Sequence, residues 1–444
     1  MRHYVLTALL LVGGVAASIP AEANALENSR RAQVAGIDLI TYHSDVKDVV
    51  VILGSLPAGD AMAEPGNVAV PTLTGMMLDR GTKSLDKFAI AEQLDDVGAE
   101  IAFSVGMQTL EVRAKCLRKD LPLVLGLIAA ELRTPAFLPQ EFSKAKQQFI
   151  GALEASSQNT EERAREAFGR AIFPQGHPNR PHSVGEYEAA AKAATLDEIK
   201  SFYAKYYGPA HMTLVVAGDV GAHEVQAETD KAFSGWSGGQ DFVHPAAPAV
   251  LTAAHEVSVP LADKPSVSVI IGQPTGLRYK DPEALALRVG TAILGSGFTG
   301  RLMGTVRDKE GLTYNIGAAV AEDSIVDGSW DISASFAPAL LDRGLASTRR
   351  ELEKWWADGV TEQELATRKQ GMIGTYLVGL STTAGLANAI LTNVQRGYGV
   401  SRLDEYPAAV KALTRDQVNA AIKNHLNPDA MVLVKAGSVA AAGH

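Results

Sequence analysis

The sequence predicts an α+β fold made of two homologous domains, each a mainly antiparallel sheet with helices packed on one face. Three observations support this. The chain has 444 residues, 46% of them hydrophobic and 20% charged, which is enough apolar material for sizeable cores. One helix–strand unit occurs twice. Short apolar runs of strand length alternate with longer helical patterns, separated by turn residues.

The repeated unit is the clearest of these signals. Residues 195–220 align without a gap with residues 414–439, and nine of the 26 pairs are identical. In each copy a Thr is placed to cap a helix, with an Asp two positions later suited to the positive helix end. A Pro then ends the helix, and a β-branched apolar run predicts a strand up to a Gly turn. Upstream, residues 51–54 resemble residues 269–272.

These matches set the expected domain boundaries. We expect a signal peptide at 1–25, an N-terminal domain at 26–233, a linker at 234–256 and a C-terminal domain at 257–444. The linker is rich in Gly, Pro and Ala around residues 234–250, a composition typical of loops.

The elements follow in order along each half. In the first half, the strands are expected at residues 37–42, 49–56, 100–105, 109–114 and 212–217, and the helices at 70–79, 87–97, 121–132, 141–157, 161–173, 184–193 and 196–207. In the second half, helices are expected at 281–294, 301–309 and 341–357, with a strand from 313. The hairpin at 100–114 alternates apolar and polar residues, so one of its faces is expected to be solvated.

The N-terminus is typical of a secretory signal. A short basic start precedes an uncharged apolar run at 4–19 and small residues that offer an A-x-A cleavage site. An uncleaved membrane anchor is the alternative, but the run is short for a span of ~20 residues. We therefore expect export to the bacterial periplasm, with no membrane attachment after cleavage.

The charge balance disfavours one class of partner, and the cysteine content excludes two kinds of site. Lys and Arg total 41 against 50 Asp and Glu, a net charge of −9, which disfavours nucleic acid as a partner. Cys116 is the single cysteine, so neither an intramolecular disulfide nor a thiolate-rich zinc site is possible.

The segment after residue 294 carries the strongest chemical signal. Residues 295–300 match G-x-G-x-x-G, but a helical pattern precedes them where a dinucleotide site needs a strand, so we interpret a loop between two helices. Arg301 then opens a helix and Tyr314 opens a strand, with one reversal between them. Both side chains could therefore reach the same sheet edge and donate hydrogen bonds to a peptide carbonyl or a developing oxyanion. A surface Arg and a half-buried Tyr without function are the alternative.

The stretch GSGFTGRLMGTVRDKEGLTYNIGAAV resembles the C-terminal half of the pitrilysin-type zinc peptidases, the family of insulin-degrading enzyme and the mitochondrial processing peptidase. The shared features are the Gly-rich loop, the Arg that follows it, and a Gly-Leu-x-Tyr motif whose Tyr lies thirteen residues beyond that Arg. The resemblance implies a clamshell of two partner chains that encloses a peptide. It also implies that Arg301 and Tyr314 bind the substrate carbonyl and stabilise the transition state in trans.

The family's zinc motif, H-x-x-E-H on a helix in the first half, has no counterpart here. Its His residues bind zinc and its Glu serves as general base. Alignment of residues 71–82 puts Thr72, Gly75 and Met76 at these three positions, and none of them suits either role. No H-x-x-E-H or H-E-x-x-H occurs elsewhere in the sequence.

Other candidate ligands are weaker. Glu154 lies near the place of the family's third ligand, although without its His partners a solvated helix residue is the simpler interpretation. The spacing of His177 and His182 matches no ligand template. We therefore expect this chain to bind no metal or cofactor, and zinc to be held by the partner.

The resulting hypothesis is a non-catalytic, substrate-binding subunit of a heterodimeric periplasmic zinc endopeptidase, paired with a zinc-bearing homologous subunit. The main alternative is a structural or peptide-binding scaffold of the same family with no proteolytic role. An autonomous hydrolase that uses other residues is a third possibility. The resemblance also suggests that peptide adds as a strand to the sheet edge at 99–104.

Overall fold

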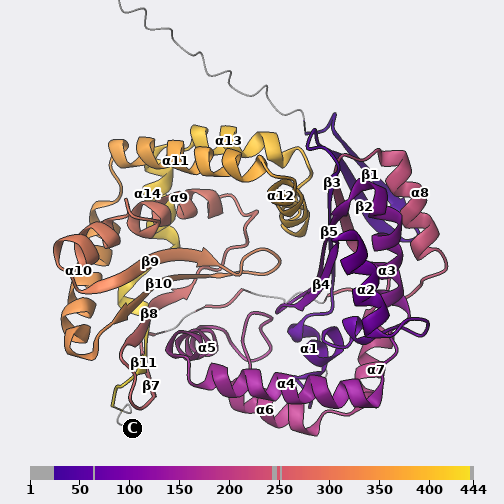
Figure 1. Ribbon diagram of the computed structural model, residues 1–444. Helices are drawn as coiled ribbons and strands as arrows, with labels where there is room; N and C mark the ends of the chain where they lie inside the picture. The colour runs from indigo at the N-terminus through magenta and orange to yellow at the C-terminus, as the bar shows by residue number, and fades with distance from the viewer. Residues whose placement is uncertain (1–24, 64–65, 243–247, 251–252, 441–444) are drawn as a thin grey trace, which may run out of the picture.

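The computed structural model describes residues 25–63, 66–242, 248–250 and 253–440. The predicted signal peptide lies outside these residues, apart from its last position. The described chain forms two halves side by side, each with one sheet and its own set of helices (Figure 1).

The first sheet has six strands in the order β1-β2-β6-β3-β5-β4. Its neighbouring strands are antiparallel except for the parallel pair β2 and β6. The strands are β1 Ser29–Val34, β2 Ile37–His43, β3 Val49–Leu56, β4 Glu100–Val105, β5 Leu110–Leu117 and β6 Thr213–Gly218.

The second sheet has five strands in the order β7-β11-β8-β10-β9, again with one parallel pair, β7 and β11. Apart from β1, the two sheets share the same sequence of parallel and antiparallel neighbours. That two copies of one ancestral unit produced them stays a prediction. The strands are β7 Glu256–Pro260, β8 Val267–Pro274, β9 Thr313–Ala321, β10 Ser329–Phe336 and β11 Val432–Gly437.

Helices occupy most of the remaining chain. Those of the first half are α1 Val70–Gly75, α2 Lys87–Val97, α3 Leu121–Arg133, α4 Pro139–Ser157, α5 Thr160–Ile172, α6 Val184–Ala193, α7 Leu196–Tyr206 and α8 Ala222–Phe233. Those of the second half are α9 Ala284–Gly295, α10 Leu341–Asp358, α11 Glu362–Leu380, α12 Thr383–Gln395, α13 Arg402–Ala412 and α14 Arg415–His425.

The predicted N-caps of the repeated unit are confirmed. Thr195 accepts a hydrogen bond from the backbone N–H of Glu198, whose carboxylate binds back to the Thr195 N–H. Thr414 and Gln417 form the same capping box at α14. Each box satisfies N–H groups that an α-helix leaves without partners, so both helices begin where the sequence predicts.

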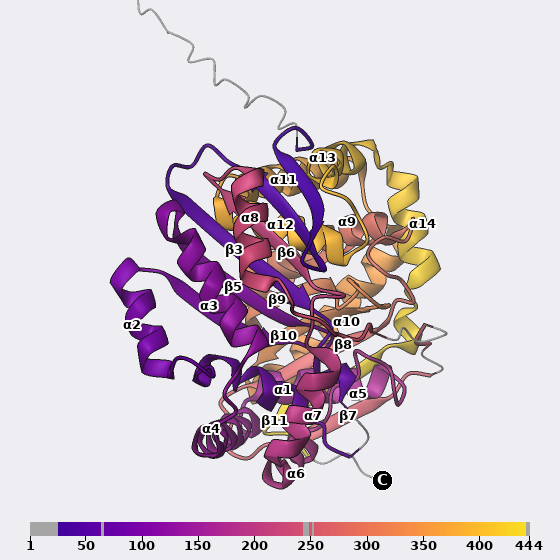
Figure 2. The same cartoon turned by 90° about the vertical axis from the view of Figure 1, so that its right-hand side faces the viewer.

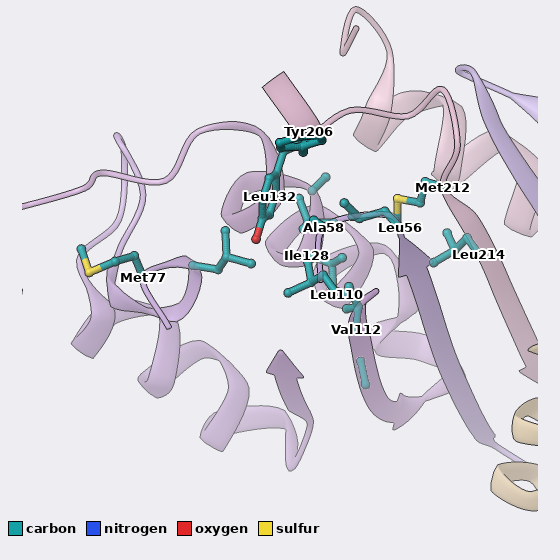
Figure 3. Packing of buried hydrophobic residues seen from close by; sticks show 14 of the residues in the cluster. Leu56, Ala58, Met77, Leu110, Val112, Ile128, Leu132, Tyr206, Met212 and Leu214 are labelled. Carbon is teal, nitrogen blue, oxygen red and sulfur yellow. The ribbon is translucent and has the colours of Figure 1, made fainter. Parts of the chain in front are cut away.

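The main core of the first half lies between the outer face of the first sheet and the helices that cover it. Alternate residues of β5, Leu110 and Val112 among them, point at the helices, while their neighbours along the strand stay more exposed. Figure 3 shows this cluster, in which Leu56 of β3 joins Ile128 and Leu132 of α3. The alternation gives the one solvated face expected for the hairpin.

The second sheet has an equivalent core centred on two tryptophans. Trp330 of β10 and Trp355 of α10 are fully buried, and their rings stack with centroids 5.9 Å apart. The indole N–H of Trp330 donates to the Thr291 hydroxyl of α9 at 2.8 Å, which satisfies a buried donor.

The prediction of an α+β fold with mainly antiparallel sheets is confirmed, but the other face of each sheet is not left open. There each half receives a helix from the other half (Figures 1 and 2). The apolar face of α12 packs on β3 and β6, whereas α5 packs on β8 and β11. Burial of these two faces ties the halves together, because either helix would expose its apolar stripe if the halves separated.

Several local features differ from the sequence-based expectation. Strand β1 and helix α8 are additional elements. The helix expected at 70–79 ends at Gly75, followed by a 3₁₀ turn at Leu78–Arg80. The segment expected as a helix at 301–309 is largely a π-helix, Met303–Lys309. Short-range periodicity does not distinguish these helix types.

Among the described residues, no single helix has both the length and the apolar composition needed to cross a membrane. The helices α11 and α12 reach that composition only as a pair, and they are bent by 112°. The apolar face of α12 is buried against the first sheet.

Candidate functional site

Tyr314 is the most exposed large side chain of the predicted site. It lies near the start of β9, at an outer edge of the second sheet, with 85% of its surface exposed. Here Ala334 pairs with Ile316 and Phe336 with Thr313, so a single residue of β10 opposes two of β9. Such a bulge redirects a side chain and explains why an aromatic residue on a strand is turned out of the core.

The π-helix Met303–Lys309 brings Arg307 to this tyrosine. Its wide turns are closed by bonds such as Glu310 N–H to Thr305 O, at 3.0 Å. The Arg307 guanidinium lies 5.0 Å from the centre of the Tyr314 ring and 5.2 Å from that of Phe298. A π-helical segment is rare and is frequent at functional sites.

Arg301, the arginine that the sequence predicted for this role, is engaged elsewhere. Its Nε and Nη2 donate to the two carboxylate oxygens of Glu364 at 2.7 and 2.8 Å, and Nη2 also donates to Gly359 O at 2.9 Å. This bidentate pair holds the pKa of Glu364 at about 2, since the Arg301 hydrogen bonds favour the ionised carboxylate.

The structure therefore pairs Tyr314 with Arg307. No hydrogen bond or ring contact joins Arg301 to Tyr314 in the described part of the chain. Sequence reasoning missed Arg307, although it stands in the same stretch, seven residues before the tyrosine. The signal was the reversal at Gly311, which brings the end of the helical segment, rather than its beginning, next to the strand. Whether either arginine binds substrate stays a prediction.

The Gly-rich loop at 295–300 presents Phe298 beside this pair. Phe298 is 75% exposed. The loop is held from behind by Arg368 of α11, which donates to Ser296 O and to the Thr299 hydroxyl, both at 3.1 Å. Gly295 is required there, because a Cβ would lie 2.2 Å from the backbone N of Ala318. As expected, the loop follows a helix, α9.

The three positions of the degenerate zinc motif lie at the end of α1. Thr72 donates to the Asp60 carboxylate at 2.8 Å, and the Tyr187 hydroxyl donates to its second oxygen, also at 2.8 Å. Burial raises the pKa of Asp60 to about 6, and these two hydrogen bonds oppose that rise. The former ligand position thus takes part in a hydrogen-bonded contact between α1, α6 and the 3₁₀ turn Asp60–Met62.

The remaining positions leave no room for a catalytic carboxylate. A Cβ on Gly75 would lie 2.3 Å from a methyl group of Val105, so β4 closes directly onto the helix. Met76 is partly buried against the main core. Glu154 lies exposed on α4. Within the described residues, no group of three or more His, Cys, Asp or Glu side chains is placed to hold a metal ion.

The two histidines of the loop after α5 have different surroundings. His177 is buried, bonds to Asp327 at 3.0 Å through Nε2, and accepts the Asn179 N–H at Nδ1. That contact joins the two halves. His182 meets the Tyr187 ring edge-on, at 5.5 Å between centroids. Cys116 is buried on β5, where desolvation raises its pKa to about 12, so its thiol is inert at neutral pH.

The predicted peptide-binding edge is the free edge of the first sheet. Strand β4 is terminal in the strand order and pairs with β5 on one side. Its residues alternate between exposed and partly buried. An edge strand has unpaired backbone groups on its outer side, which is the requirement for strand addition. Peptide binding at this edge stays a prediction.

Comparisons with known proteins bear on the family and the fold of this chain. The family model described as "Peptidase M16 inactive domain" matches residues 193–372. An uncharacterized zinc protease of Streptomyces coelicolor is 25% identical over 79% of this chain and 76% of its own length. The non-peptidase homolog YmxG of Helicobacter pylori is 20% identical over 96% of both chains.

Solved structures show the same fold. A peptidase M16 inactive domain from Pseudomonas fluorescens superposes with a TM-score of 0.83, at 22% identity, over 94% of this chain and 99% of its own. A protease from Helicobacter pylori gives a TM-score of 0.82 at 17% identity, over 92% and 98% of the two chains. At these identities the likeness concerns the fold.

Proposed function

We propose that this chain, which matches the M16 inactive-domain model over residues 193–372 and shares the fold of such domains, is the non-catalytic, substrate-supporting subunit of a heterodimeric zinc endopeptidase. In this proposal a homologous zinc-bearing subunit cleaves the peptide, and this chain contributes Tyr314 and Arg307 to the shared chamber. The non-catalytic part of this role is supported by the matched inactive-domain model and by the residues at 72, 75 and 76.

One observation carries the proposal: the exposed ring of Tyr314 and the guanidinium of Arg307 lie together at a sheet edge. Tyr314 has no hydrogen-bond partner among the described residues, and the nearest acid of Arg307 is its sequence neighbour Asp308, at 4.0 Å. No hydrogen bond among the described residues uses the Tyr314 hydroxyl or the terminal nitrogens of Arg307. Both groups can therefore donate to a peptide carbonyl whose oxygen gains charge in the transition state. Arg301 would then act indirectly, by fixing the start of the π-helix to α11.

The N-terminal half supports the non-catalytic role. Its zinc positions are occupied by Thr72, Gly75 and Met76, and Val105 fills the space that a glutamate side chain at position 75 would need. In the proposal, the zinc and the activated water come from the partner subunit. The proposal also places the pair in the periplasm, on the strength of the predicted signal peptide.

A reconstitution assay tests the proposal. We expect no cleavage of a fluorogenic peptide by this chain alone, little by a zinc-bearing homologue from the same organism, and efficient cleavage by the mixture. In the mixture, Arg307→Ala and Tyr314→Phe should each lower kcat/KM by about 10²–10³, the usual loss for one oxyanion-type donor. Arg343→Ala, an exposed arginine of α10, is the matched control and should have no effect.

Full activity of a mixture that carries both substitutions would contradict the role. A stable homodimer, or an unrelated partner with no cleavage, would instead favour the structural or peptide-binding scaffold. Cleavage by the purified chain together with stoichiometric bound metal would favour an autonomous hydrolase.

A further inference from the structure

A cavity of about 750 Å³ lies between the two halves, away from the site described above. The first half contributes the ends of β3 and β6 and the β4–β5 turn. The second half contributes the β9–β10 loop, the loop before α9 and the C-terminal end of α12. Tyr314 begins β9, whereas Ser324 of the cavity wall follows the end of that strand. The volume is within the usual range for small-molecule sites, which often lie between domains.

Three cations stand in the wall supplied by the second half: Arg278, Lys280 and Arg396. Arg278 has an acid close by, since its Nη2 is 4.0 Å from Asp281. Lys280 donates to Gly397 O at 2.5 Å, a neutral partner at the end of α12. Lys280 and Arg396 thus face the cavity without a carboxylate partner among the described residues.

Of Lys280 and Arg396, Arg396 has the more unusual surroundings. Its Nε donates to the Ser324 hydroxyl at 3.2 Å, and its guanidinium lies 3.6 Å from the centre of the Tyr279 ring. Arg288 approaches the same ring at 4.4 Å, but its charge is compensated by Asp323. No hydrogen bond is formed by the terminal nitrogens of Arg396 in the described structure.

A partly buried guanidinium that has no carboxylate within ion-pair distance and lies beside a second arginine is electrostatically unfavourable. Desolvation also lowers the pKa of Arg396, because burial disfavours the charged form of the guanidinium. A carboxylate would relieve this cost, because its two oxygens match the two free nitrogens of the fork.

The rest of the wall indicates what accompanies such a carboxylate. Apolar side chains line part of the cavity, namely Pro57, Met212, Ile325 and Val394. Gln395 bonds Ser55 at 3.0 Å across the halves. Of the acids in the wall, Asp38 is neutralised by a bidentate pair with Arg31, and Asp241 lies 3.7 Å from His211. Apolar surface next to unpaired cations suits a ligand with an apolar body and an anionic end.

We propose that this cavity binds the free carboxylate of an amphipathic ligand, the C-terminus of a short peptide with an apolar last side chain, with Arg396 as its anchor and Lys280 as a second cation. The same chemistry could be supplied by a free aliphatic acid. The site does not depend on the proposed function, because it requires neither zinc nor a partner subunit.

Binding to the full chain tests the proposal by isothermal titration calorimetry. The probes are N-acetyl-Ala-Ala-Leu with a free carboxylate, the same peptide as its C-terminal amide, hexanoate, and inorganic phosphate. We expect the peptide acid to bind at least ten times more tightly than the amide or phosphate. Hexanoate binding as tightly as the peptide acid would overturn the peptide assignment, and equal binding of acid and amide would overturn the whole site.

Variants separate anchoring from folding. Arg396→Gln should weaken the peptide acid at least tenfold and leave the weak binding of the amide unchanged, whereas Arg343→Gln on α10 should change neither. Lys280 is more exposed than Arg396, so Lys280→Met should weaken binding of the peptide acid by a smaller factor. Thermal melts would identify any variant that fails to fold. Unchanged affinity for the acid in folded Arg396→Gln and Lys280→Met would reject the proposal.

Discussion

The structure assigns different tasks to the two arginines that frame the π-helix, and their replacement should separate these tasks. Arg301→Ala is expected to lower the stability of the chain, and Arg307→Ala to leave it nearly unchanged. The Arg301 side chain is 18% exposed and grips Glu364, whose side chain is 31% exposed. The Arg307 side chain is 26% exposed, but it has no bidentate partner and stacks on two exposed rings.

The expected magnitude follows from the ion pair. Relative to its ordinary value of 4.5, a Glu364 pKa of about 2 corresponds to about 3 kcal/mol. Hydrogen bonds from Thr361 supply part of this shift, and solvent screens the partly exposed pair, so the share of Arg301 is about 1–2 kcal/mol. The lost bond to Gly359 O adds about 1 kcal/mol. Arg301→Ala should therefore destabilise the chain by about 2–3 kcal/mol, and Arg307→Ala by less than about 0.5 kcal/mol.

The pH dependence gives the sign of this effect. Because the pKa of Glu364 is lowered in the folded state, its contribution is fully present above about pH 4.5 and disappears as the pH falls towards 2. Urea unfolding, followed by tryptophan fluorescence at pH 7 and pH 3, measures the difference between the chain and its Arg301→Ala variant. Equal destabilisation by Arg307→Ala, or a difference that grows at pH 3, would refute the reasoning.

Three further changes test other parts of the structure. Gly75→Glu should destabilise the chain by about 1–3 kcal/mol, because Val105 already occupies the space; a neutral effect in urea unfolding would show that β4 can move. The pKa of Asp60 is raised to about 6, so its contribution to the free energy of unfolding is present below about pH 4 and is lost as the pH rises through 6. Asp60→Asn should flatten the dependence of stability on pH in that window, and an unchanged profile would argue against this titration. Trp355→Ala should cost about 3–5 kcal/mol through the cavity left beside Trp330, and a loss below about 1 kcal/mol in the same assay would mean that the second core is loosely packed.

Most of the candidate site was within reach of sequence reasoning. The Gly-rich loop and Tyr314 are local in sequence and were singled out from their residues, whereas the positions 72, 75 and 76 followed from the resemblance to the zinc peptidases. The choice between Arg301 and Arg307 was not, because it depends on where the π-helix ends relative to β9. The partner of Arg301, Glu364, lies 63 residues away and leaves no local signal.

The elements themselves were predicted well where hydrophobic periodicity is strong. The helix at 87–97 and the strand at 49–56 agree with α2 and β3 residue by residue. Strand β1 was missed because its apolar and charged residues give no clear alternation, and α8 because its first turn lacks a side-chain cap.

The order of apolar and polar residues, the caps and the turn residues determined by themselves that this chain forms two α+β halves and holds no zinc motif. Only the tertiary structure decided that α5 and α12 each cover the sheet of the opposite half, that Arg307 stands beside Tyr314, and that Arg396 faces a cavity with no carboxylate as its ion-pair partner. The reason is physical. Periodicity records that a face is apolar, whereas the surface that buries it, or the charge that a guanidinium meets, depends on residues distant in the chain.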